Sequence, residues 1–262
     1  MIDIHHHCLP GIDDGPKEWK SAVEQCRMAF DQGISTIVAT PHVLRGSWQN
    51  DAPGAIDALV EKLHSQLQGK PEILTGCEYY FAHDMIDMLQ RKTILPLASS
   101  RYVLVEFAAH SLPPMIDRVF YQLQISGWTP IIAHPERNLV FQRRPELLQS
   151  LVERGGKTQV TAMSITGGFG ARARRAALEW IARGMVHIVA TDAHNTSTRP
   201  PLVREPRSIV ETQFGEEMAA ALFERNPLAI IRNETLSFDP EPFDPRPPTG
   251  LLEALRQFLG RS

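Results

Sequence analysis

Two periods of hydrophobic and polar positions alternate along the chain. Short apolar runs rich in β-branched residues are separated by longer stretches in which apolar residues recur every three or four positions, a pattern typical of strands alternating with amphipathic helices. The strand-like runs are residues 1–7, 36–42, 72–80, 101–107, 129–135, 157–162 and 187–193. The helix-like stretches are residues 18–32, 54–68, 83–91, 115–126, 145–154, 171–183 and 203–225, the last as one helix or two.

This order of elements predicts an α/β fold built from repeated βα units around a parallel sheet. Barrels of the (β/α) type typically take about 250 residues, which suits a chain of 262 residues. An open doubly wound sheet is the alternative, but no Gly-rich dinucleotide-binding motif follows the first run. We therefore expect a closed barrel.

The sequence changes in character after residue 236. Residues 237–250 are rich in Pro, which predicts an extended segment, and residues 251–260 carry leucines at helical spacing. We therefore divide the chain into a barrel over residues 1–236 and a tail over residues 237–262. The last helix is expected to pack on its own barrel, with a contact to a neighbouring subunit or a partner as the alternative.

Composition excludes several classes of function. A net charge of −3 gives no indication of binding to nucleic acid or to an anionic membrane. Three scattered cysteines without a C-x-x-C motif argue against a disulfide framework. Neither a signal peptide nor an apolar run of about 18 residues occurs, so we expect no membrane insertion and a cytoplasmic location. The oligomeric state stays open, a homo-oligomer being one alternative.

The first strand-like run contains three consecutive histidines. In a regular strand, His5 and His7 lie on one face together with Asp3. His6 lies on the opposite face together with Ile4. A pair of imidazoles at positions i and i+2 has the spacing of metal ligands, and the alternative is a pair of core histidines bonded to the backbone.

Each of six strand-like runs ends in, or leads into, an imidazole or a carboxylate. These residues are His5, His7, Asp14, His42, Glu78, Glu106, His134, Asp192 and His194. The carboxyl ends of barrel strands converge on one mouth, where unpaired charges would be costly to bury. This mixture of ligands suits Mn, Fe or Zn. Nine ligands exceed what one or two ions need, so three ions that share a bridging carboxylate are expected.

Two arginines follow two of these residues closely in the sequence. Arg137 comes just after His134 and Arg199 just after His194. Guanidinium groups bind phosphate with two parallel hydrogen bonds, whereas a surface salt bridge is the alternative for each arginine alone. Beside a metal cluster, the pair indicates an anionic substrate, most simply a phosphate ester.

Other phosphatase chemistries find no support in the sequence. None of the three cysteines begins a Cys-x5-Arg loop, and no G-x-S-x-G motif occurs. A water activated by metal ions remains as the nucleophile.

Several motifs resemble those of a known superfamily. "DIHHHCLPGIDDG", "TIVATPH", "GCEYYF", "SRYVLVEF", "IIAHPERN", "SITGGFG" and "IVATDAHNTSTRPP" resemble, in order, motifs of the PHP (polymerase and histidinol phosphatase) superfamily. More narrowly, they resemble the manganese-dependent protein-tyrosine phosphatases of bacterial capsule and exopolysaccharide operons. The resemblance covers residues 1 to about 233. It implies a distorted (β/α)7 barrel with three divalent metal ions, for which Mn is the expected metal.

The resemblance also implies roles for single residues. The first ion is expected on His5, His7, Glu78 and Asp192. Glu78 bridges to a second ion on Glu106 and His134, and a third lies on Asp14, His42 and His194. The expected catalytic residues are Arg137, Arg199, His42 and Asp14. The arginines grip the phosphoryl group, and either His42 or a metal-bound water protonates the leaving phenolate. His6 stands where the family usually has a small residue such as Ser. Thr161 stands where the family often has Asn.

The implied substrate is the phosphorylated Tyr-rich tail of a membrane-associated tyrosine kinase that controls polysaccharide export. Two alternatives stay open: a phosphatase of a small ester such as histidinol phosphate, and a non-catalytic metal-binding module that regulates a kinase. The complete set of nine ligands and two arginines favours an enzyme.

Overall fold

The computed structural model describes residues 1–236 and residue 238. The Pro-rich segment and the helix expected over residues 251–260 therefore lie outside the described residues, and the division of the chain at residue 236 stays a prediction. No helix in the described part is both long and apolar enough to cross a membrane.

Within the described residues, all strands are parallel and form two sheets. One sheet has the order β1 (Ile2–His6), β2 (Thr36–Ala39) and β4 (Glu72–Thr75). The other has the order β3 (His42–Val43), β5 (Glu78–Tyr80), β6 (Tyr102–Glu106), β7 (Thr129–Ala133), β8 (Lys157–Thr161) and β9 (Ile188–Ala190). Every strand-like run of the sequence is thus a strand, and two of the runs are broken in the middle.

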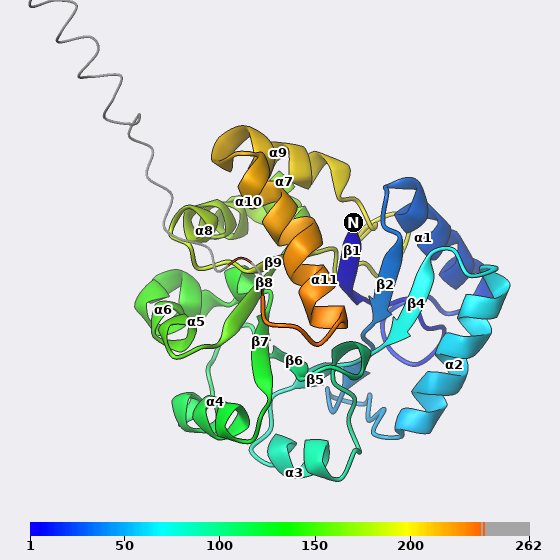
Figure 1. Ribbon diagram of the computed structural model, residues 1–262, viewed down its shortest axis with the longest axis horizontal. Coiled ribbons are helices and arrows are strands. Elements are labelled where there is room, and N and C mark those ends of the chain that lie inside the picture. The colour runs from blue at the N-terminus through cyan, green and yellow to red at the C-terminus, as the bar shows by residue number, and fades with distance from the viewer. Residues whose placement is uncertain (237, 239–262) are drawn as a thin grey trace, which may run out of the picture.

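The two sheets close into one barrel (Figure 1). β2 and β3 are the halves of one predicted run, interrupted at Thr40 and Pro41, and β4 and β5 are the halves of the next. β1 meets the chain that follows β9, where the amide of Asp192 donates to the His5 carbonyl at 2.8 Å. The predicted (β/α)7 barrel is confirmed, and the broken second and third strands are its distortion.

The helices surround this barrel. They are α1 (Trp19–Asp31), α2 (Pro53–Gln66), α3 (Met85–Gln90), α4 (Ile116–Ile125), α5 (Leu139–Arg143), α6 (Pro145–Glu153), α7 (Ala162–Thr166), α8 (Gly170–Ala182), α9 (Arg204–Phe214), α10 (Glu216–Ala220) and α11 (Asn226–Ile231). A π-helical turn, Ala221–Arg225, joins the last two. The predicted 203–225 stretch is divided at Gly215, which has a φ of +92°. The short helices α5, α7 and α11 were not predicted.

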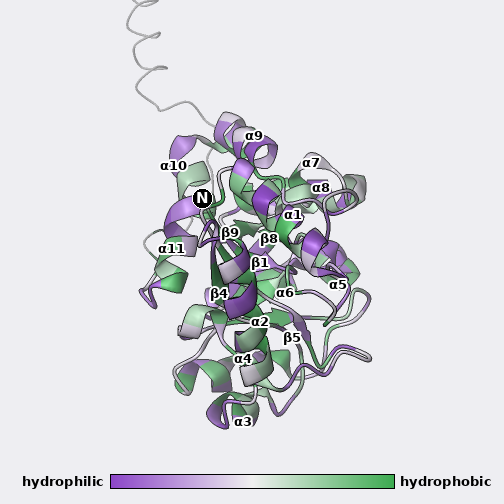
Figure 2. Ribbon diagram, turned by 90° about the vertical axis from the view of Figure 1, so that its right-hand side faces the viewer, coloured by the Kyte–Doolittle hydropathy of each residue, from purple (hydrophilic) through white to green (hydrophobic). Residues whose placement is uncertain are grey.

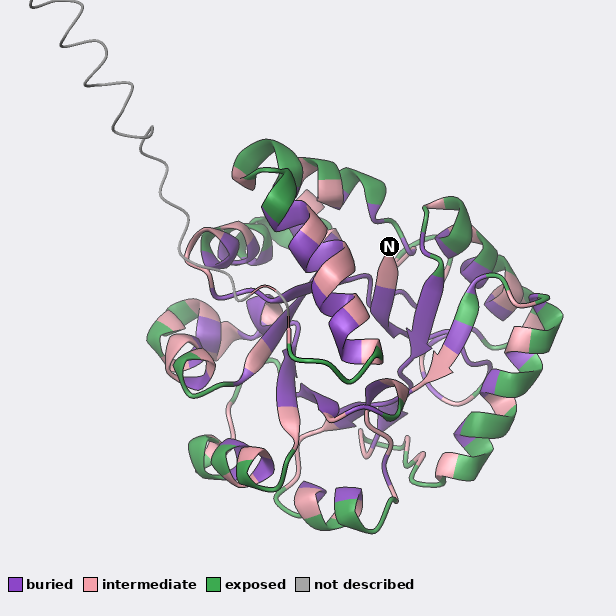
Figure 3. Ribbon diagram, viewed as in Figure 1, coloured by how far each residue is buried: buried purple, intermediate pink, exposed green. Residues whose placement is uncertain are grey.

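The core has an inner and an outer layer. Ile4, Val38, Leu104 and Ile188 are fully buried inside the barrel. Ile230 of α11 packs against the same layer, so α11 closes one end of the barrel (Figure 1). The outer layer lies between strands and helices. The helices bury one side and expose the other (Figure 3), and they carry hydrophobic as well as hydrophilic residues (Figure 2).

β1 does not alternate as a regular strand. Asp3 pairs with Ile37 and His6 pairs with Ala39, so β1 has one residue more than β2 over this stretch. Such an extra residue is a β-bulge and reverses the faces of the residues beyond it. Ile4 lies in the barrel interior.

The expected grouping of these side chains is therefore partly wrong. Asp3 does not join the two metal-ligand candidates: its Oδ2 lies 2.9 Å from His6 Nδ1. His6 points away from the mouth as expected, with Nε2 3.0 Å from the Gln25 side chain of α1. His5 and His7 do face each other, with their Nε2 atoms 3.2 Å apart.

Candidate metal centre

All nine predicted metal-ligand candidates come together at the carboxyl ends of the strands. Eight of them are buried, and the Asp14 side chain is 37% exposed. Their side-chain nitrogen and oxygen atoms form overlapping groups in which the atoms of each group lie within 4.8 Å of one another. The mouth of the barrel thus gathers residues from the whole length of the predicted sheet.

The first group contains His5, His7, Glu78 and Asp192. The Glu78 Oε2 lies 3.4 Å from His5 Nε2 and 3.3 Å from His7 Nε2. The Asp192 Oδ1 lies 3.3 Å and 3.5 Å from the same two nitrogens. Ligands about 2.1 Å from a tetrahedral ion lie about 3.4 Å from one another. The spacing between the imidazoles and the carboxylates of this group therefore suits ligands of one ion.

Glu78 connects this group to a second one. Its Oε1 lies 2.7 Å from His134 Nε2, and its Oε2 lies 2.8 Å from His42 Nδ1. Glu106 is the other carboxylate of this second group, and its Oε1 lies 3.9 Å from His134 Nε2. One carboxylate thus faces four imidazoles, an arrangement typical of a bridging ligand.

A third group lies on the solvent side. Asp14 Oδ1 is 3.3 Å from His42 Nε2 and 3.1 Å from His194 Nε2. His7 belongs to this group as well as to the first. Asp14 is the most exposed of the nine, so this group opens toward solvent.

The hydrogen bonding of these groups fits metal binding. Among the described residues, several buried polar atoms of the cluster have no hydrogen-bond partner. They are Asp14 Oδ1, His42 Nδ1, Glu78 Oε2, Glu106 Oε2 and His194 Nε2. Buried polar atoms without partners are costly and rare in proteins. Cations bound among them would satisfy them all, so the residues present fit a metal cluster.

The surroundings shift the pKa values of three of these residues. Burial and the Glu78 carboxylate raise the pKa of Glu106 to about 7. Burial and the Arg137 charge lower the pKa of His134 to about 4, so this imidazole is neutral at pH 7 with a lone pair available. Burial opposes the ionisation of Asp192, but His5 and Arg137 outweigh it and hold the pKa of Asp192 well below its usual range.

Neighbouring residues fix the orientation of the imidazoles. His5 Nδ1 donates to Gln159 Oε1 at 2.8 Å, and His7 Nδ1 donates to Asp13 Oδ2 at 2.8 Å. Each bond leaves the Nε2 atom facing the cluster, as second-shell partners of metal ligands do. Asp13 and Gln159 were missed in the sequence. Asp13 adjoins a predicted ligand, whereas Gln159 is signalled only as a polar residue within a buried strand.

Two of the ligand candidates have strained backbones. His134 has a φ of +33° and Asp192 a φ of +51°, the left-handed region that costs a non-glycine residue about 1 kcal/mol or more. Both follow the last residues of a strand, where the chain turns into the mouth. Strained backbone of this kind is common at functional sites. Here it places the side chains of His134 and Asp192 in the cluster.

Both predicted arginines reach the cluster. Arg137 Nη1 and Arg199 Nη2 lie 2.5 Å and 2.6 Å from the same atom, Asp192 Oδ2. Their guanidinium groups lie 4.6 Å and 5.8 Å from the Phe169 ring, which the sequence did not single out. Two forked donors thus converge beside the first group and can grip an anion there.

A third arginine was missed in the sequence. Arg45 Nε lies 3.1 Å from Glu106 Oε2, and Arg45 Nη1 lies 2.6 Å from His42 Nε2. The Trp48 ring stacks on His42 at 5.3 Å between ring centroids. This loop, just after β3, covers the outer side of the cluster.

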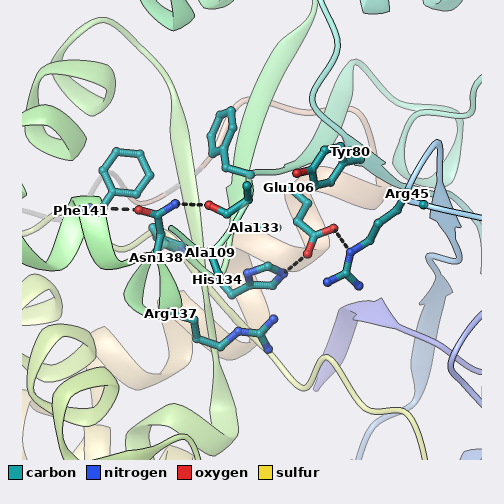
Figure 4. Close-up of a pocket in the computed structure, with 13 residues that line it drawn as sticks. Arg45, Tyr80, Glu106, Ala109, Ala133, His134, Arg137, Asn138 and Phe141 are labelled. Atoms are coloured by element: carbon teal, nitrogen blue, oxygen red, sulfur yellow. Dashed lines mark hydrogen bonds and ion pairs between the residues drawn. The ribbon is translucent and has the colours of Figure 1, made fainter. Parts of the chain in front are cut away.

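A pocket of about 380 Å³ opens beside Glu106 and His134. These two residues lie in the middle of Figure 4, and Arg45 and Arg137 approach them from opposite sides. The other walls are largely apolar and aromatic, lined by Tyr80, Phe107, Ala109 and Phe141. A pocket with a charged end and aromatic walls suits a phosphorylated aromatic side chain.

Comparison with known sequences identifies relatives along almost the whole chain. Residues 1–232 match the family model "Capsular polysaccharide synthesis, CpsB/CapC". The tyrosine-protein phosphatase YwqE of Bacillus subtilis is 36% identical over 92% of this chain and 95% of its own length. The tyrosine-protein phosphatase CpsB of Streptococcus pneumoniae is 30% identical over 90% of this chain and 100% of its own length.

Solved structures agree with these matches. A crystal structure from work on YwqE and CpsB, described as metal-dependent tyrosine phosphatases, superposes with a TM-score of 0.88 at 36% identity. The match covers 93% of this chain and 100% of that one. The phosphotriesterase homology protein of Escherichia coli, at 10% identity and a TM-score of 0.56 over 87% of this chain and 97% of that one, shares the fold. The family expected from the motifs is confirmed: the chain belongs to the CpsB/CapC family of capsular polysaccharide synthesis proteins.

Proposed function

We propose that this chain is a metal-dependent protein-tyrosine phosphatase that acts in bacterial capsule or exopolysaccharide synthesis. The enzyme class expected from the motifs is confirmed at the level of the family, since close relatives are named tyrosine-protein phosphatases. The observation that carries the proposal is one mouth that holds both two imidazoles 3.2 Å apart, each 3.3–3.5 Å from the carboxylates of Glu78 and Asp192, and two converging arginines.

We assign three divalent cations to the cluster, with Mn preferred and Fe or Zn as alternatives. His5, His7, Glu78 and Asp192 would hold the first. Glu78, Glu106 and His134 would hold the second, and Asp14, His42 and His194 the third. When bound, such cations supply an activated water and offset the negative charge of the phosphoryl group.

The protein's own residues orient the substrate. Arg137 and Arg199 exchange their shared contact with Asp192 Oδ2 for the phosphoryl oxygens, and both rest against Phe169. The pocket beside Glu106 takes the phenyl ring. An aliphatic phosphate would leave these aromatic walls uncovered, so the pocket favours phosphotyrosine over a small ester.

His42 and Asp14 complete the proposed catalytic set. Asp14 is the ligand most open to solvent, and its Oδ1 lies 3.3 Å from His42 Nε2. The pair thus offers a route for the proton that the leaving phenolate needs, either from His42 itself or from water held by the third group.

The proposed physiological substrate is the phosphorylated Tyr-rich tail of a membrane-associated tyrosine kinase. Support comes from the family's role in capsular polysaccharide synthesis and from the aromatic pocket. The cytoplasmic location expected from the sequence is part of this proposal.

The test is phosphate release from a phosphotyrosine peptide by chelator-stripped protein before and after Mn²⁺ is restored. A phosphoserine peptide and histidinol phosphate are measured in parallel. Hydrolysis of the phosphotyrosine peptide that returns with Mn²⁺ supports the proposal. Hydrolysis of histidinol phosphate alone would contradict the substrate class, and metal binding without any hydrolysis would point to a regulatory module.

A further inference from the structure

A second pocket, of about 400 Å³, lies beside the mouth and is lined by three arginines. Arg143 comes from α5, and Arg172 and Arg175 come from α8. Its lining also includes Leu139 and Pro145. None of these residues belongs to the metal centre.

The pocket has more positive than negative charge, with three arginines and one glutamate in its lining. Within the described part of the chain, Arg143, Arg172 and Arg175 are exposed and form no ion pair. Glu179, the acidic residue of the lining, lies 3.5 Å from Arg183 instead. Three guanidinium groups around a hollow that none of them shares with an ion-pair partner attract an anion. This local charge contrasts with the net charge of −3 of the whole chain.

Both helices of the pocket begin at the mouth. α5 starts two residues after Arg137, and α8 starts directly after Phe169, whose ring lies against Arg137 and Arg199. At about 1.5 Å per helical residue, Arg172 and Arg175 lie about 5 Å and 9 Å along the axis from Phe169. An extended peptide covers this distance in about two to four residues.

We propose that the arginine pocket binds a second phosphotyrosine of the same peptide while the first occupies the metal centre. This inference rests on the proposed function and extends it. The three guanidinium groups pair with the second phosphoryl group, and Leu139 and Pro145 offer apolar surface to its ring. The enzyme then prefers segments in which phosphotyrosines stand a few residues apart and removes their phosphates in succession.

The test compares peptides with one phosphotyrosine and with two at spacings of two to six residues, on the Mn²⁺-loaded full chain. For the wild type we expect kcat/KM to be about tenfold higher for the best doubly phosphorylated peptide, the worth of one charge-assisted contact. R172E/R175E should abolish this preference and leave kcat/KM for the singly phosphorylated peptide and for p-nitrophenyl phosphate unchanged. R154E, a single charge reversal of the same type at an exposed site outside the pocket, should behave as the wild type.

The outcomes separate this inference from the function on which it rests. If the wild type hydrolyses the single peptide but shows no preference for two phosphotyrosines, the arginine pocket has no such role and the phosphatase assignment stands. An equal loss on both peptides, or the same loss in R154E, would also overturn the inference. If no phosphotyrosine peptide is hydrolysed, the proposed function itself fails.

Discussion

At the scale of single residues, Glu78 is the centre of the site. Its fully buried carboxylate lies between 2.7 Å and 3.4 Å from nitrogens of His5, His7, His42 and His134. A single buried carboxylate among four imidazoles has little structural use without cations, because the imidazole lone pairs would face one another unsatisfied. This residue is the strongest reason to read the cluster as a metal centre.

Gln159 offers a test of the residues that orient the ligands. Gln159→Leu removes the acceptor of His5 Nδ1, so that imidazole loses its orientation. We expect metal affinity to fall by about 10- to 100-fold, with activity restored when Mn²⁺ is raised. Isothermal titration with Mn²⁺ measures the loss. Gln122→Leu, on the surface of α4, serves as the control, and an unchanged affinity in Gln159→Leu would exclude the orienting role.

Arg199 offers a test of phosphate capture. Arg199→Ala should weaken inhibition by phosphate and by vanadate about tenfold or more, because one of two forked donors to the phosphoryl oxygens is lost. Metal content should stay unchanged, since no metal is assigned to Arg199. Inhibition constants for both anions, determined together with the metal content, check this result. If the anions inhibit Arg199→Ala as strongly as the wild type, Arg199 does not bind the phosphoryl group.

Much of the site could be predicted from the sequence at this scale. Each ligand follows an apolar run at a place where barrel strands end, and the motifs of the family supply the grouping. Gln159, Asp13 and Arg45 could not be predicted in the same way, because their roles depend on contacts between distant elements. Nothing local in the sequence says that Gln159 of β8 faces His5 of β1.

At the scale of elements, the segment after β1 positions two of the groups. Asp13 binds His7 and accepts from the amide of Gly15 at 2.8 Å, while Asp14 reaches the third group. A Cβ on Gly15 would lie 2.8 Å from the His7 carbonyl and 2.9 Å from Asp13 Oδ1. The turn therefore needs glycine for space.

Gly15→Ala tests this packing. The added methyl group must displace either the His7 backbone or Asp13, so we expect weaker metal binding and a loss of activity of about tenfold or more. Gly54→Ala, where nothing lies within 4 Å of the added Cβ, is the matched control. Titration with Mn²⁺ and measurement of kcat/KM compare the two variants. Equal Mn²⁺ affinities and equal kcat/KM values would show that the turn tolerates the methyl group.

The elements also show why some expectations failed. The order and type of the long helices follow from periodicity, and they were predicted. The β-bulge in β1 and the breaks within the second and third strands depend on the register with neighbouring strands, which local pattern does not carry. α5, α7 and α11 are too short to show a clear helical period.

At the scale of the whole molecule, the barrel is closed by the metal site at one end and by α11 at the other. The ligands come from β1, the segments after it, and the ends of the following strands, so bound cations cross-link the first and last strands. Metal binding should therefore stabilise the entire fold rather than a single loop.

Thermal unfolding tests this coupling. At a metal concentration 100-fold above the dissociation constant, binding contributes about 2.7 kcal/mol, and each kcal/mol raises the Tm of a chain of this size by about 2–4 °C. We expect the Tm to fall by about 5–10 °C on chelation and to return with Mn²⁺. Calorimetry with and without chelator measures this change in Tm. The change on chelation should be smaller for His5→Ala than for the wild type. Equal Tm values for the wild type with and without chelator would show that metal binding does not stabilise the fold.

The metal centre is tested most directly by the anomalous diffraction of crystals grown with Mn²⁺, recorded at the Mn absorption edge. We expect three peaks: one among His5, His7, Glu78 and Asp192, one among Glu78, Glu106 and His134, and one among Asp14, His42 and His194. The absence of peaks at this mouth, or peaks held by other residues, would contradict the metal centre on which the proposed phosphatase depends.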